Sequence, residues 1–371
     1  MMRPTHGGNL VWAAAVAGCS PSEILDFSAS INPLGPPKSA IAAIQAHLGE
    51  LGAYPDPNYW ELRTALGQWH QLPPEWILPG NGSAELLTWA GWDLAQLTKT
   101  FLSTPAFADY YRALKAFGAK VQECPLELEK LEDRQDACPT FSNSLECGLL
   151  LNNPHNPTGQ MFLREKILPY LEQFALVVVD EAFMDFLPPE QEQSLICVVQ
   201  EYPNLVILRS LTKFYSLPGL RLGYAIAHPD RLQSWQQRRD PWSINTLAAA
   251  AAVAVIQDRE FQQRTWKWLP SARIELFEGL SQISGLRPYQ SSANFLLVQT
   301  EHLSSTLQEK LLQHDQILIR DCLSFPTLGD RFFRVAVRSE VENKRLLQAL
   351  KERSEDAGAD LRFRGQRSGG V

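Results

Sequence analysis

The chain has 371 residues, of which 45% are hydrophobic and 20% are charged, and its formal net charge is −7. This length allows two domains or one large domain with a smaller one, and the composition is that of a soluble globular protein. Lysine and arginine are scattered and form no basic stripe, which argues against a nucleic-acid partner.

Cysteine usage and the N-terminal sequence bear on the cellular compartment. The six cysteines lie far apart without a CxxC pair, so we expect reduced thiols in the cytoplasm and no metal site. The first ten residues lack the apolar segment of a signal peptide. The longest apolar stretch, Leu247 to Ile256, is about half of a membrane span and predicts a buried helix. We therefore expect no membrane role.

The chain opens with His6-Gly7-Gly8-Asn9, followed by a short apolar helix over residues 10–17. Two glycines after a histidine, next to an apolar helix, predict an ordered and closely packed arm rather than a flexible terminus. Further helices are expected at 39–48 and 59–70.

Short apolar runs then alternate with longer amphipathic segments. The expected strands are 100–103, 120–123, 148–151, 176–179, 205–208 and 223–227, and the expected helices between them include 84–97, 108–117 and 165–174. This alternation predicts βαβ units and a mainly parallel sheet.

The C-terminal third has a different pattern. A long helix over about 243–268 is followed by strands at 293–298 and 331–337 and by helices at 304–313 and 342–352. We expect an N-terminal arm and part of the small domain at 1–48, a large domain at 49–255, a smaller α+β domain at 256–353, and a disordered tail at 354–371.

An acid and a lysine each stand where a buried strand is expected to end. Asp180 follows the apolar run 176–179, and Lys213 comes soon after the run 205–208. Pyridoxal phosphate (PLP) needs these two residue types, an amine for a Schiff base and a carboxylate for its pyridinium nitrogen. The simpler alternatives are a helix cap for Asp180 and a surface position for Lys213.

Two more segments fit a phosphate-bearing cofactor. Gly82-Ser83-Ala84 opens a helix, whose free N–H groups suit a phosphate, although an ordinary helix start would look the same. Ser210 precedes Lys213 by three residues and Arg221 follows it by eight, and a hydroxyl with a guanidinium suits a phosphate anchor. Asn156-Pro157-Thr158-Gly159 follows another strand and could equally be a simple turn.

Taken jointly, these motifs resemble those of the fold-type-I PLP-dependent enzymes, the aspartate aminotransferase superfamily. The matching segments are Asn156-Pro157-Thr158-Gly159, Asp180-Glu181-Ala182-Phe183, Ser210 to Lys213, and Arg221. The resemblance extends from about His6 to Arg338. It implies an α/β fold in which a large domain contains a mainly parallel seven-stranded sheet and a smaller domain is α+β.

The resemblance also implies roles for single residues. Lys213 would form the Schiff base, Asp180 would pair with the pyridine nitrogen, Asn156 would hydrogen-bond the ring 3-oxygen, and Phe107 would stack on the ring. The phosphate would be held by Gly82, Ser83, Ala84, Ser210 and Arg221. Tyr54 would reach the phosphate of the neighbouring subunit's cofactor, which implies a homodimer with shared active sites.

Two subgroups are most similar, the histidinol-phosphate aminotransferases and the L-threonine-O-3-phosphate decarboxylases of cobalamin biosynthesis. The His-Gly-Gly-Asn arm and the segment from Asp26 to Gly35 resemble the decarboxylases. Phe183 stands where the aminotransferases usually have a tyrosine, whose hydroxyl would donate to the ring 3-oxygen, so we expect altered electronics at the Schiff base. His155 is a departure from the resemblance, because this subgroup usually has asparagine before the residue that matches Asn156.

The segments around Arg320 and Arg338 complete the resemblance to the decarboxylases. It implies substrate contacts by His6, Asn32, Asn156, Arg320 and Arg338. Cationic partners suit a substrate that carries a carboxylate and a phosphate, although either arginine could simply be a surface residue. The implied reaction converts L-threonine O-3-phosphate into (R)-1-amino-2-propanol O-2-phosphate.

Three alternatives stay open. A histidinol-phosphate aminotransferase would transfer an amino group to 2-oxoglutarate. A non-catalytic PLP-binding regulator would usually carry a DNA-binding helical domain, for which an arm that starts at His6 leaves no room. A PLP-free structural protein of the same fold would require Lys213 to be idle.

Overall fold

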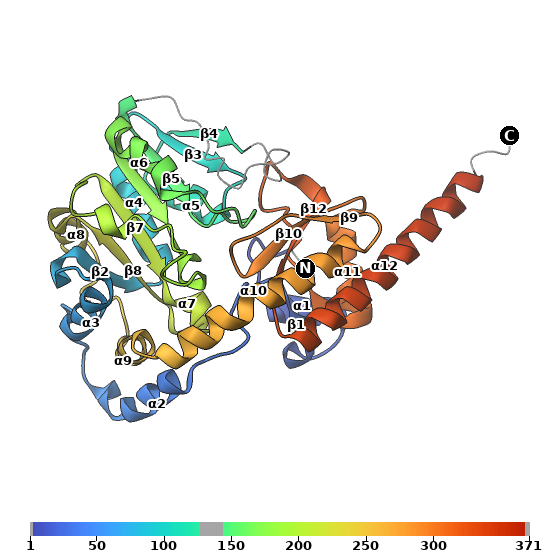
Figure 1. Ribbon diagram of the computed structural model, residues 1–371, viewed down its shortest axis with the longest axis horizontal. Coiled ribbons are helices and arrows are strands. Elements are labelled where there is room, and N and C mark those ends of the chain that lie inside the picture. The colour runs from blue at the N-terminus through green and yellow to red at the C-terminus, as the bar shows by residue number, and fades with distance from the viewer. Residues whose placement is uncertain (1–2, 127–143, 368–371) are drawn as a thin grey trace. The chain divides into compact units, whose positions relative to one another are not determined.

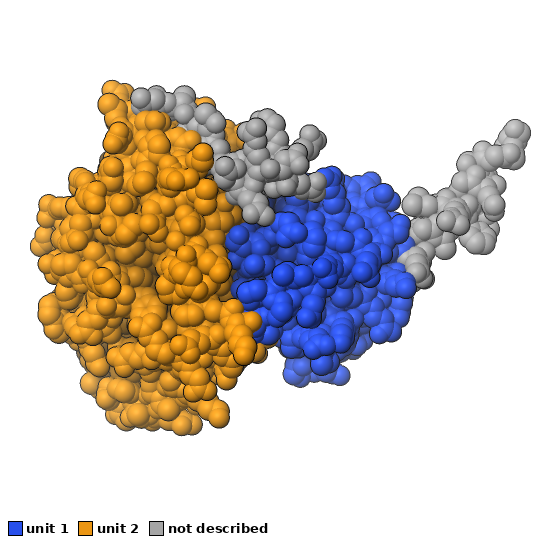
Figure 2. All heavy atoms as spheres, in the orientation of Figure 1, with its two compact units in different colours: residues 1–30, 157–159, 268–371 blue, residues 31–156, 160–267 orange. Residues whose placement is uncertain are grey.

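The computed structural model describes residues 3–126 and 144–367 and divides into two compact units, which are coloured separately in Figure 2. Unit 1 comprises residues 1–30, 157–159 and 268–371, and unit 2 comprises residues 31–156 and 160–267. The sequence placed its domain limits at 48/49 and 255/256 instead. The first limit differs because helix α2 (Lys38–Ala46) packs against helix α9 (Thr246–Ile256) within unit 2.

Unit 2 is built around a seven-stranded sheet with the strand order β2-β8-β7-β6-β5-β3-β4 (Figure 1). Its strands are β2 (Ile77–Asn81), β3 (Thr100–Thr104), β4 (Val121–Pro125), β5 (Ser144–Asn152), β6 (Phe174–Asp180), β7 (Leu205–Ser210) and β8 (Leu222–Ala227). Strands β4, β3, β5, β6 and β7 run parallel, whereas β8 is antiparallel to both of its neighbours. The fold predicted from the sequence, a mainly parallel seven-stranded sheet with a second α+β unit, is confirmed.

The sequence missed β2 because Pro79 and Gly80 are poor strand residues. Proline removes a backbone donor from the ladder, and is tolerated at a sheet edge. Strand β2 occupies such an edge and pairs only with β8 among the strands of this sheet that the structure describes. Its position is important because helix α4 (Ser83–Leu94) follows it after a single residue, Gly82.

The remaining helices of unit 2 are α3 (Trp60–His70), α5 (Ala108–Ala116), α6 (Arg164–Gln173), α7 (Leu211–Phe214) and α8 (Pro229–Gln236). The helix predicted over 243–268 is two helices, α9 and α10 (Arg259–Ser281). The break lies at Asp258, whose side chain accepts the N–H of Phe261 at 2.9 Å and so caps the second helix.

The two faces of the sheet have different partners. Side chains alternate between the faces along a strand, so Val178 shares a face with Asp180, and Leu208 shares a face with Ser210. Val178 and Leu208 belong to one buried cluster with residues of α4 and α5. Asp180 and Ser210 are therefore carried to the carboxyl ends of β6 and β7 on the face that α4 and α5 cover.

Unit 1 contains a three-stranded antiparallel sheet and a two-stranded parallel one. The three-stranded sheet has the order β12-β10-β9, and β1 pairs with β11. The elements are α1 (Leu10–Ala17), β1 (Leu25–Asp26), β9 (Leu286–Pro288), β10 (Phe295–Thr300), α11 (Ser304–Asp315), β11 (Ile317–Leu318), β12 (Phe332–Ala336) and α12 (Glu340–Arg367).

The tail differs from its predicted form. Helix α12 continues to Arg367, so it is longer than the helix expected at 342–352 and extends into the predicted tail. Residues 368–371 of that tail and Cys138 lie outside the described residues. Within the described part of the chain, the helices are too short or too polar to span a lipid bilayer.

Candidate functional site

Asp180 ends β6 as a buried carboxylate with two protein donors. The backbone N–H of Ala182 donates to Oδ1 at 2.9 Å, and the hydroxyl of Tyr110 donates to Oδ2 at 2.8 Å. Burial raises the pKa of Asp180, while the nearby charge of Lys213 and the Tyr110 hydrogen bond lower it. The carboxylate is therefore fixed in direction and has a cation close by.

Lys213 lies on α7, directly after β7, and is half-buried. Its Nζ is 4.8 Å from the centroid of the Phe183 ring. Asn32 holds this segment: its backbone N–H donates to the carbonyl of Lys213 at 3.0 Å, and its side-chain amide donates to Phe214 O and Thr265 Oγ1, both at 2.9 Å. The structure thus uses both amide hydrogens of Asn32 to fix the helix that carries the lysine.

The Asn156 loop is tied to the strand end that carries Asp180. Asn152 accepts the backbone N–H of Asn156 at 2.6 Å on its Oδ1 and donates from its Nδ2 to the carbonyl of Asp180 at 2.7 Å. The neighbouring His155 is buried, and desolvation lowers its pKa to about 3. His155 is therefore neutral at physiological pH and adds no charge to the site.

The phosphate-binding residues predicted from the sequence gather around the start of α4. Gly82 has a φ of +75°, and a Cβ there would lie 2.6 Å from Nη2 of Arg221. A Cβ on Gly223 would lie 2.5 Å from the backbone nitrogen of Ser83, and Gly223 is the strand partner of Ser210. These close approaches form a cradle of helix N–H groups, a guanidinium and a hydroxyl, which suits a phosphate.

Phe107 and Tyr110 lie at the start of α5. Phe107 is the N-cap residue, and its ring meets that of Tyr110 edge-on with centroids 5.8 Å apart. The sequence singled out Phe107 but missed Tyr110. Its spacing from Phe107 could have suggested Tyr110, because residues three apart on a helix share a face. The hydrogen bond to Asp180, 70 residues away, could not be predicted from that spacing.

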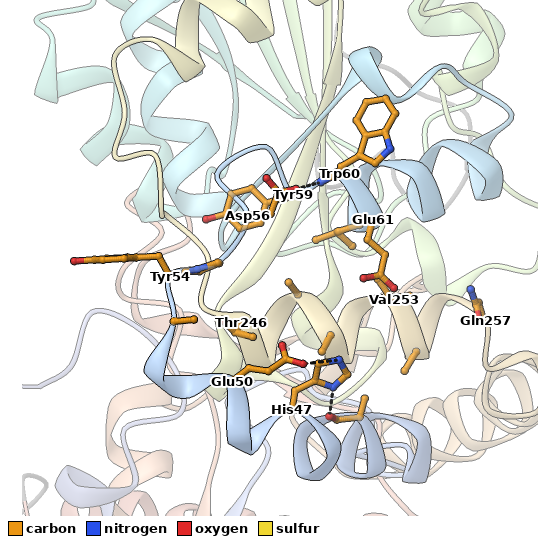
Figure 3. Close-up of a pocket in the computed structure, with 17 residues that line it drawn as sticks. His47, Glu50, Tyr54, Asp56, Tyr59, Trp60, Glu61, Thr246, Val253 and Gln257 are labelled. Carbon is orange, nitrogen blue, oxygen red and sulfur yellow. Dashed lines mark hydrogen bonds and ion pairs between the residues drawn. The ribbon is translucent and has the colours of Figure 1, made fainter.

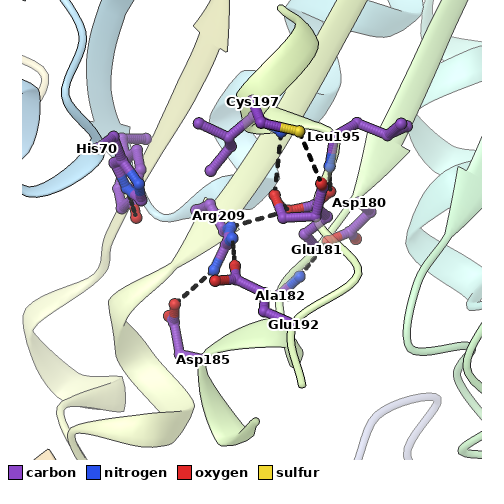
Figure 4. A network of polar contacts seen from close by, with 12 residues as sticks. His70, Asp180, Glu181, Ala182, Asp185, Glu192, Leu195, Cys197 and Arg209 are labelled. Atoms are coloured by element: carbon purple, nitrogen blue, oxygen red, sulfur yellow. Dashed lines mark hydrogen bonds and ion pairs between the residues drawn. The ribbon is translucent and has the colours of Figure 1, made fainter. Parts of the chain in front are cut away.

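A buried ionic network lies behind these strand ends (Figure 4). Arg209 precedes Ser210, so its side chain points to the opposite face of the sheet. Its guanidinium contacts Glu181 at 3.0 Å, Asp185 at 2.6 Å, and Glu192. Glu181 also accepts hydrogen bonds from the hydroxyl of Ser194 at 2.6 Å and the N–H of Leu195 at 3.1 Å.

Tyr54 lies at the rim of a pocket elsewhere in unit 2 (Figure 3). The pocket has a volume of about 710 Å³ and is lined by residues of α2, α3, α9 and the short helix η2 (Leu48–Gly52). Tyr54 is 79% exposed and its ring centroid is 4.4 Å from that of Trp242. Other large apolar side chains exposed on these elements are Ile41, Leu48, Leu51 and Trp60.

The arm of unit 1 is closely packed, as the sequence predicted. A Cβ on Gly7 would lie 2.4 Å from the carbonyl oxygen of Ser28, and Gly8 has a φ of +80°. The N–H of Gly8 donates to Oγ of Ser28 at 2.8 Å, and Asn9 caps α1 by accepting the N–H of Trp12 at 3.0 Å. His6, the predicted substrate residue of this arm, is exposed.

The arginines of unit 1 have different surroundings. Arg320 and Arg334 are bridged by backbone hydrogen bonds of 3.0 and 2.7 Å, and both side chains are buried. Burial, followed by repulsion from Arg320, lowers the pKa of Arg334 to about 10. Arg338, by contrast, forms an ion pair of 2.7 Å with Glu342 and donates to the carbonyl of Asp26 at 3.1 Å. Arg320 and Arg338 were predicted from the sequence as substrate residues, whereas Arg334, buried beside Arg320, was not considered.

The residues of unit 2 fit the cofactor that the sequence predicted. A half-buried lysine, a buried carboxylate near it and a phosphate cradle that a single Cβ would obstruct are the three protein features that PLP needs. The observed geometry thus unites Lys213, Asp180, Phe107 and the residues around α4 within one unit.

Comparisons with known proteins support the predicted fold and cofactor. The model of the family described as aminotransferase class I and II matches residues 22–350. The threonine-phosphate decarboxylase of Salmonella typhimurium is 39% identical over 361 residues, which cover 95% of this chain and 97% of the relative. The resemblance to decarboxylases of this kind, inferred from the motifs, is confirmed.

Aminotransferases match as well. Histidinol-phosphate aminotransferase 1 of Nitrosococcus oceani is 35% identical over 323 residues, covering 86% of each chain. The crystal structure of the histidinol-phosphate aminotransferase from Clostridium acetobutylicum superimposes with a TM-score of 0.79 and 30% identity, covering 90% of this chain and all of the other. Both predicted subgroups are therefore relatives of this chain.

Proposed function

This chain belongs to the family of class I and II aminotransferases, and we propose that it is a PLP-dependent carboxy-lyase acting on L-threonine O-3-phosphate. Its product would be (R)-1-amino-2-propanol O-2-phosphate, the precursor of the aminopropanol linker in cobalamin biosynthesis. The observation that carries this proposal is the 39% identity to a threonine-phosphate decarboxylase along almost the whole length of both chains.

The geometry of unit 2 supports a set of cofactor residues. When bound, PLP supplies an aldehyde that condenses with amines and a protonated ring that accepts an electron pair. Lys213 would bind it covalently through Nζ, and Asp180 would pair with its ring nitrogen. Asn156 would hydrogen-bond the ring 3-oxygen, and Phe107 would stack on the ring. Gly82, Ser83, Ala84, Ser210 and Arg221 would hold the phosphate.

The reaction breaks the bond between Cα and the carboxylate of the substrate. Asp180 and Phe107 would fix the position of the cofactor, and the cationic residues of unit 1 would orient the substrate so that this bond, and not the Cα–H bond, is the one that breaks. The ionised Asp180 keeps the ring protonated and so favours this step. The amine of Lys213 would supply the proton that Cα takes up after CO2 has left.

The cationic residues of unit 1 would bind the anionic groups of the substrate. We propose Arg320 and Arg338, as the sequence implied, and add Arg334 because it is buried directly beside Arg320. Two adjacent guanidinium groups repel each other, and a bound phosphate would relieve this repulsion. His6 would add a further donor, and Asn32 would act by fixing the segment of Lys213.

Phe183 supports decarboxylation over amino transfer. It lies against Nζ of Lys213, at 4.8 Å from the ring centroid, and its ring has no hydroxyl to donate to the cofactor. The alternative function is that of a histidinol-phosphate aminotransferase, which the relatives of that name favour.

We further propose that the protein is a cytoplasmic homodimer with shared active sites. The exposed apolar side chains of α2, η2 and α3 and the exposed Tyr54 support a partner on these elements, which pack against α9, because exposed apolar patches mark interaction sites. A second copy that covers this surface would receive Tyr54 near its cofactor phosphate. Cys19, Cys124, Cys197 and Cys322 are free thiols, which suits a reducing compartment.

One paired assay tests the function. PLP-loaded protein is incubated with L-threonine O-3-phosphate, and CO2 and aminopropanol phosphate are measured. In parallel it receives histidinol phosphate with 2-oxoglutarate, and glutamate is measured. CO2 without glutamate is expected, and Lys213→Ala should abolish it. Glutamate without CO2 would establish the aminotransferase and overturn the proposed decarboxylase.

A further inference from the structure

Tyr110 is a buried residue of α5 that contacts two residues of the cofactor site. It is 2% exposed, its hydroxyl donates to Oδ2 of Asp180 at 2.8 Å, and its ring meets Phe107 edge-on at 5.8 Å. Asp180 would meet the cofactor's ring nitrogen and Phe107 would stack on its ring. Tyr110 thus contacts both side chains that would fix the plane of the cofactor ring, and it would act on the ring through them.

The Tyr110 hydroxyl donates one of two hydrogen bonds that the structure shows on the Asp180 carboxylate. Ala182 N–H occupies Oδ1 at 2.9 Å, and Tyr110 occupies Oδ2. Each oxygen keeps a lone pair for the ring nitrogen. A hydrogen bond to a buried carboxylate stabilises its ionised form, and it also restricts rotation of the carboxylate plane.

We propose that Tyr110 is a positioning residue for the cofactor: its hydroxyl holds Asp180 ionised and aimed at the ring nitrogen, while its ring supports Phe107. This inference rests on the proposed PLP-dependent function and deepens it. It assigns to α5 a role in tuning the cofactor, in addition to its packing against the sheet.

The chain offers a matched control one residue along the same helix. Tyr111 also ends in a hydroxyl that donates to a carboxylate, that of Glu123, at 2.6 Å, but this pair is exposed. Tyr110→Phe and Tyr111→Phe remove the same atom from adjacent positions. A general effect of losing a tyrosine hydroxyl in α5 would affect both variants equally.

The experiment compares the two variants as holoenzymes. Tyr110→Phe should weaken PLP binding about tenfold, in line with loss of one hydrogen bond to a buried charge. The pH midpoint of the bound cofactor's absorbance, which reports the proton on Lys213 Nζ, should move upward because a less fully protonated ring withdraws fewer electrons. The kcat should fall with little change in KM, and Tyr111→Phe should match wild type in all three measurements.

A double variant separates action through Asp180 from a purely structural role. In an Asp180→Asn background, Tyr110→Phe should leave PLP affinity and the absorbance midpoint unchanged, because the charge on which it acts is gone. An equal effect of Tyr110→Phe in both backgrounds, equal behaviour of the two tyrosine variants, or loss of native circular dichroism in Tyr110→Phe would overturn the proposal. Wild-type protein that binds no PLP would refute the proposed function itself.

Discussion

Removal of Arg209 should destabilise the protein strongly. Its guanidinium is the cation that contacts Glu181, Asp185 and Glu192, and the side chains of Arg209 and Glu181 are 1% and 0% exposed. Arg209→Met keeps a long unbranched side chain but removes the guanidinium, so the three carboxylates lose this partner. Loss of one partner from a buried ion pair costs about 3–5 kcal/mol. We expect a decrease of that size in the free energy of unfolding, measured by urea denaturation at pH 7.

A second substitution tests the cause of this loss. Arg209→Met/Glu181→Gln removes the charge of Glu181, the most deeply buried of the three carboxylates. A glutamine can still pair with Ser194 and the N–H of Leu195, so the double variant should be more stable than Arg209→Met alone. Lys344→Met, which breaks an exposed ion pair with Glu340, serves as the control and should leave stability unchanged. A double variant no more stable than the single one would refute the electrostatic explanation.

Three further predictions concern pH, cofactor and substrate. The pKa of His155 is about 3 in the folded state and about 6.5 in the unfolded state, so the unfolded state takes up a proton first as the pH falls. Below about pH 6.5, the free energy of unfolding of wild-type protein should therefore fall more steeply with decreasing pH than that of His155→Asn. The same pH dependence of the free energy of unfolding in both proteins would contradict this. Gly82→Ala places a Cβ 2.6 Å from a guanidinium nitrogen of the cradle and should weaken PLP binding at least about tenfold in an absorbance titration, whereas Gly49→Ala, which meets nothing within 4 Å, should not. Arg334→Met should raise KM for L-threonine O-3-phosphate more than Arg338→Met does in steady-state CO2 assays, and the reverse order would favour the choice made from the sequence.

The sequence predicted the parts of the site that follow directly from strand ends. An apolar run marks a buried parallel strand, and the residue after it arrives at the edge where such sheets bind ligands. The positions of Asp180 and Ser210 at the carboxyl ends of their strands could therefore be predicted from the sequence alone. Lys213 follows Ser210 within one helical turn, so its position was predictable as well.

Contacts between distant segments were not predictable in this way. Tyr110 reaches Asp180 across 70 residues, and Arg209 reaches Glu192 across 17, through loops whose course no periodicity determines. Arg338 illustrates a second limit. Strand β12 ends at Ala336, so the alternation that places Arg334 does not extend to Arg338, which instead meets Glu342 in the first turn of α12.

The surroundings of Arg320, Arg334 and Arg338 bear on how a decarboxylase would use them. A carboxylate held in a strong ion pair is stabilised in the ground state, and this stabilisation is lost as neutral CO2 departs, so a tight grip would slow the reaction. Arg338 is partly neutralised by Glu342 at 2.7 Å, whereas Arg320 and Arg334 lie side by side. The substrate phosphate, which the reaction keeps, would then be held firmly by Arg320 and Arg334. The substrate carboxylate, which leaves as CO2, would be held only loosely by Arg338. The substrate of an aminotransferase keeps its carboxylate, so no such loose contact is needed there. If Arg338 binds the substrate carboxylate as proposed, its ion pair with Glu342 would therefore favour decarboxylation.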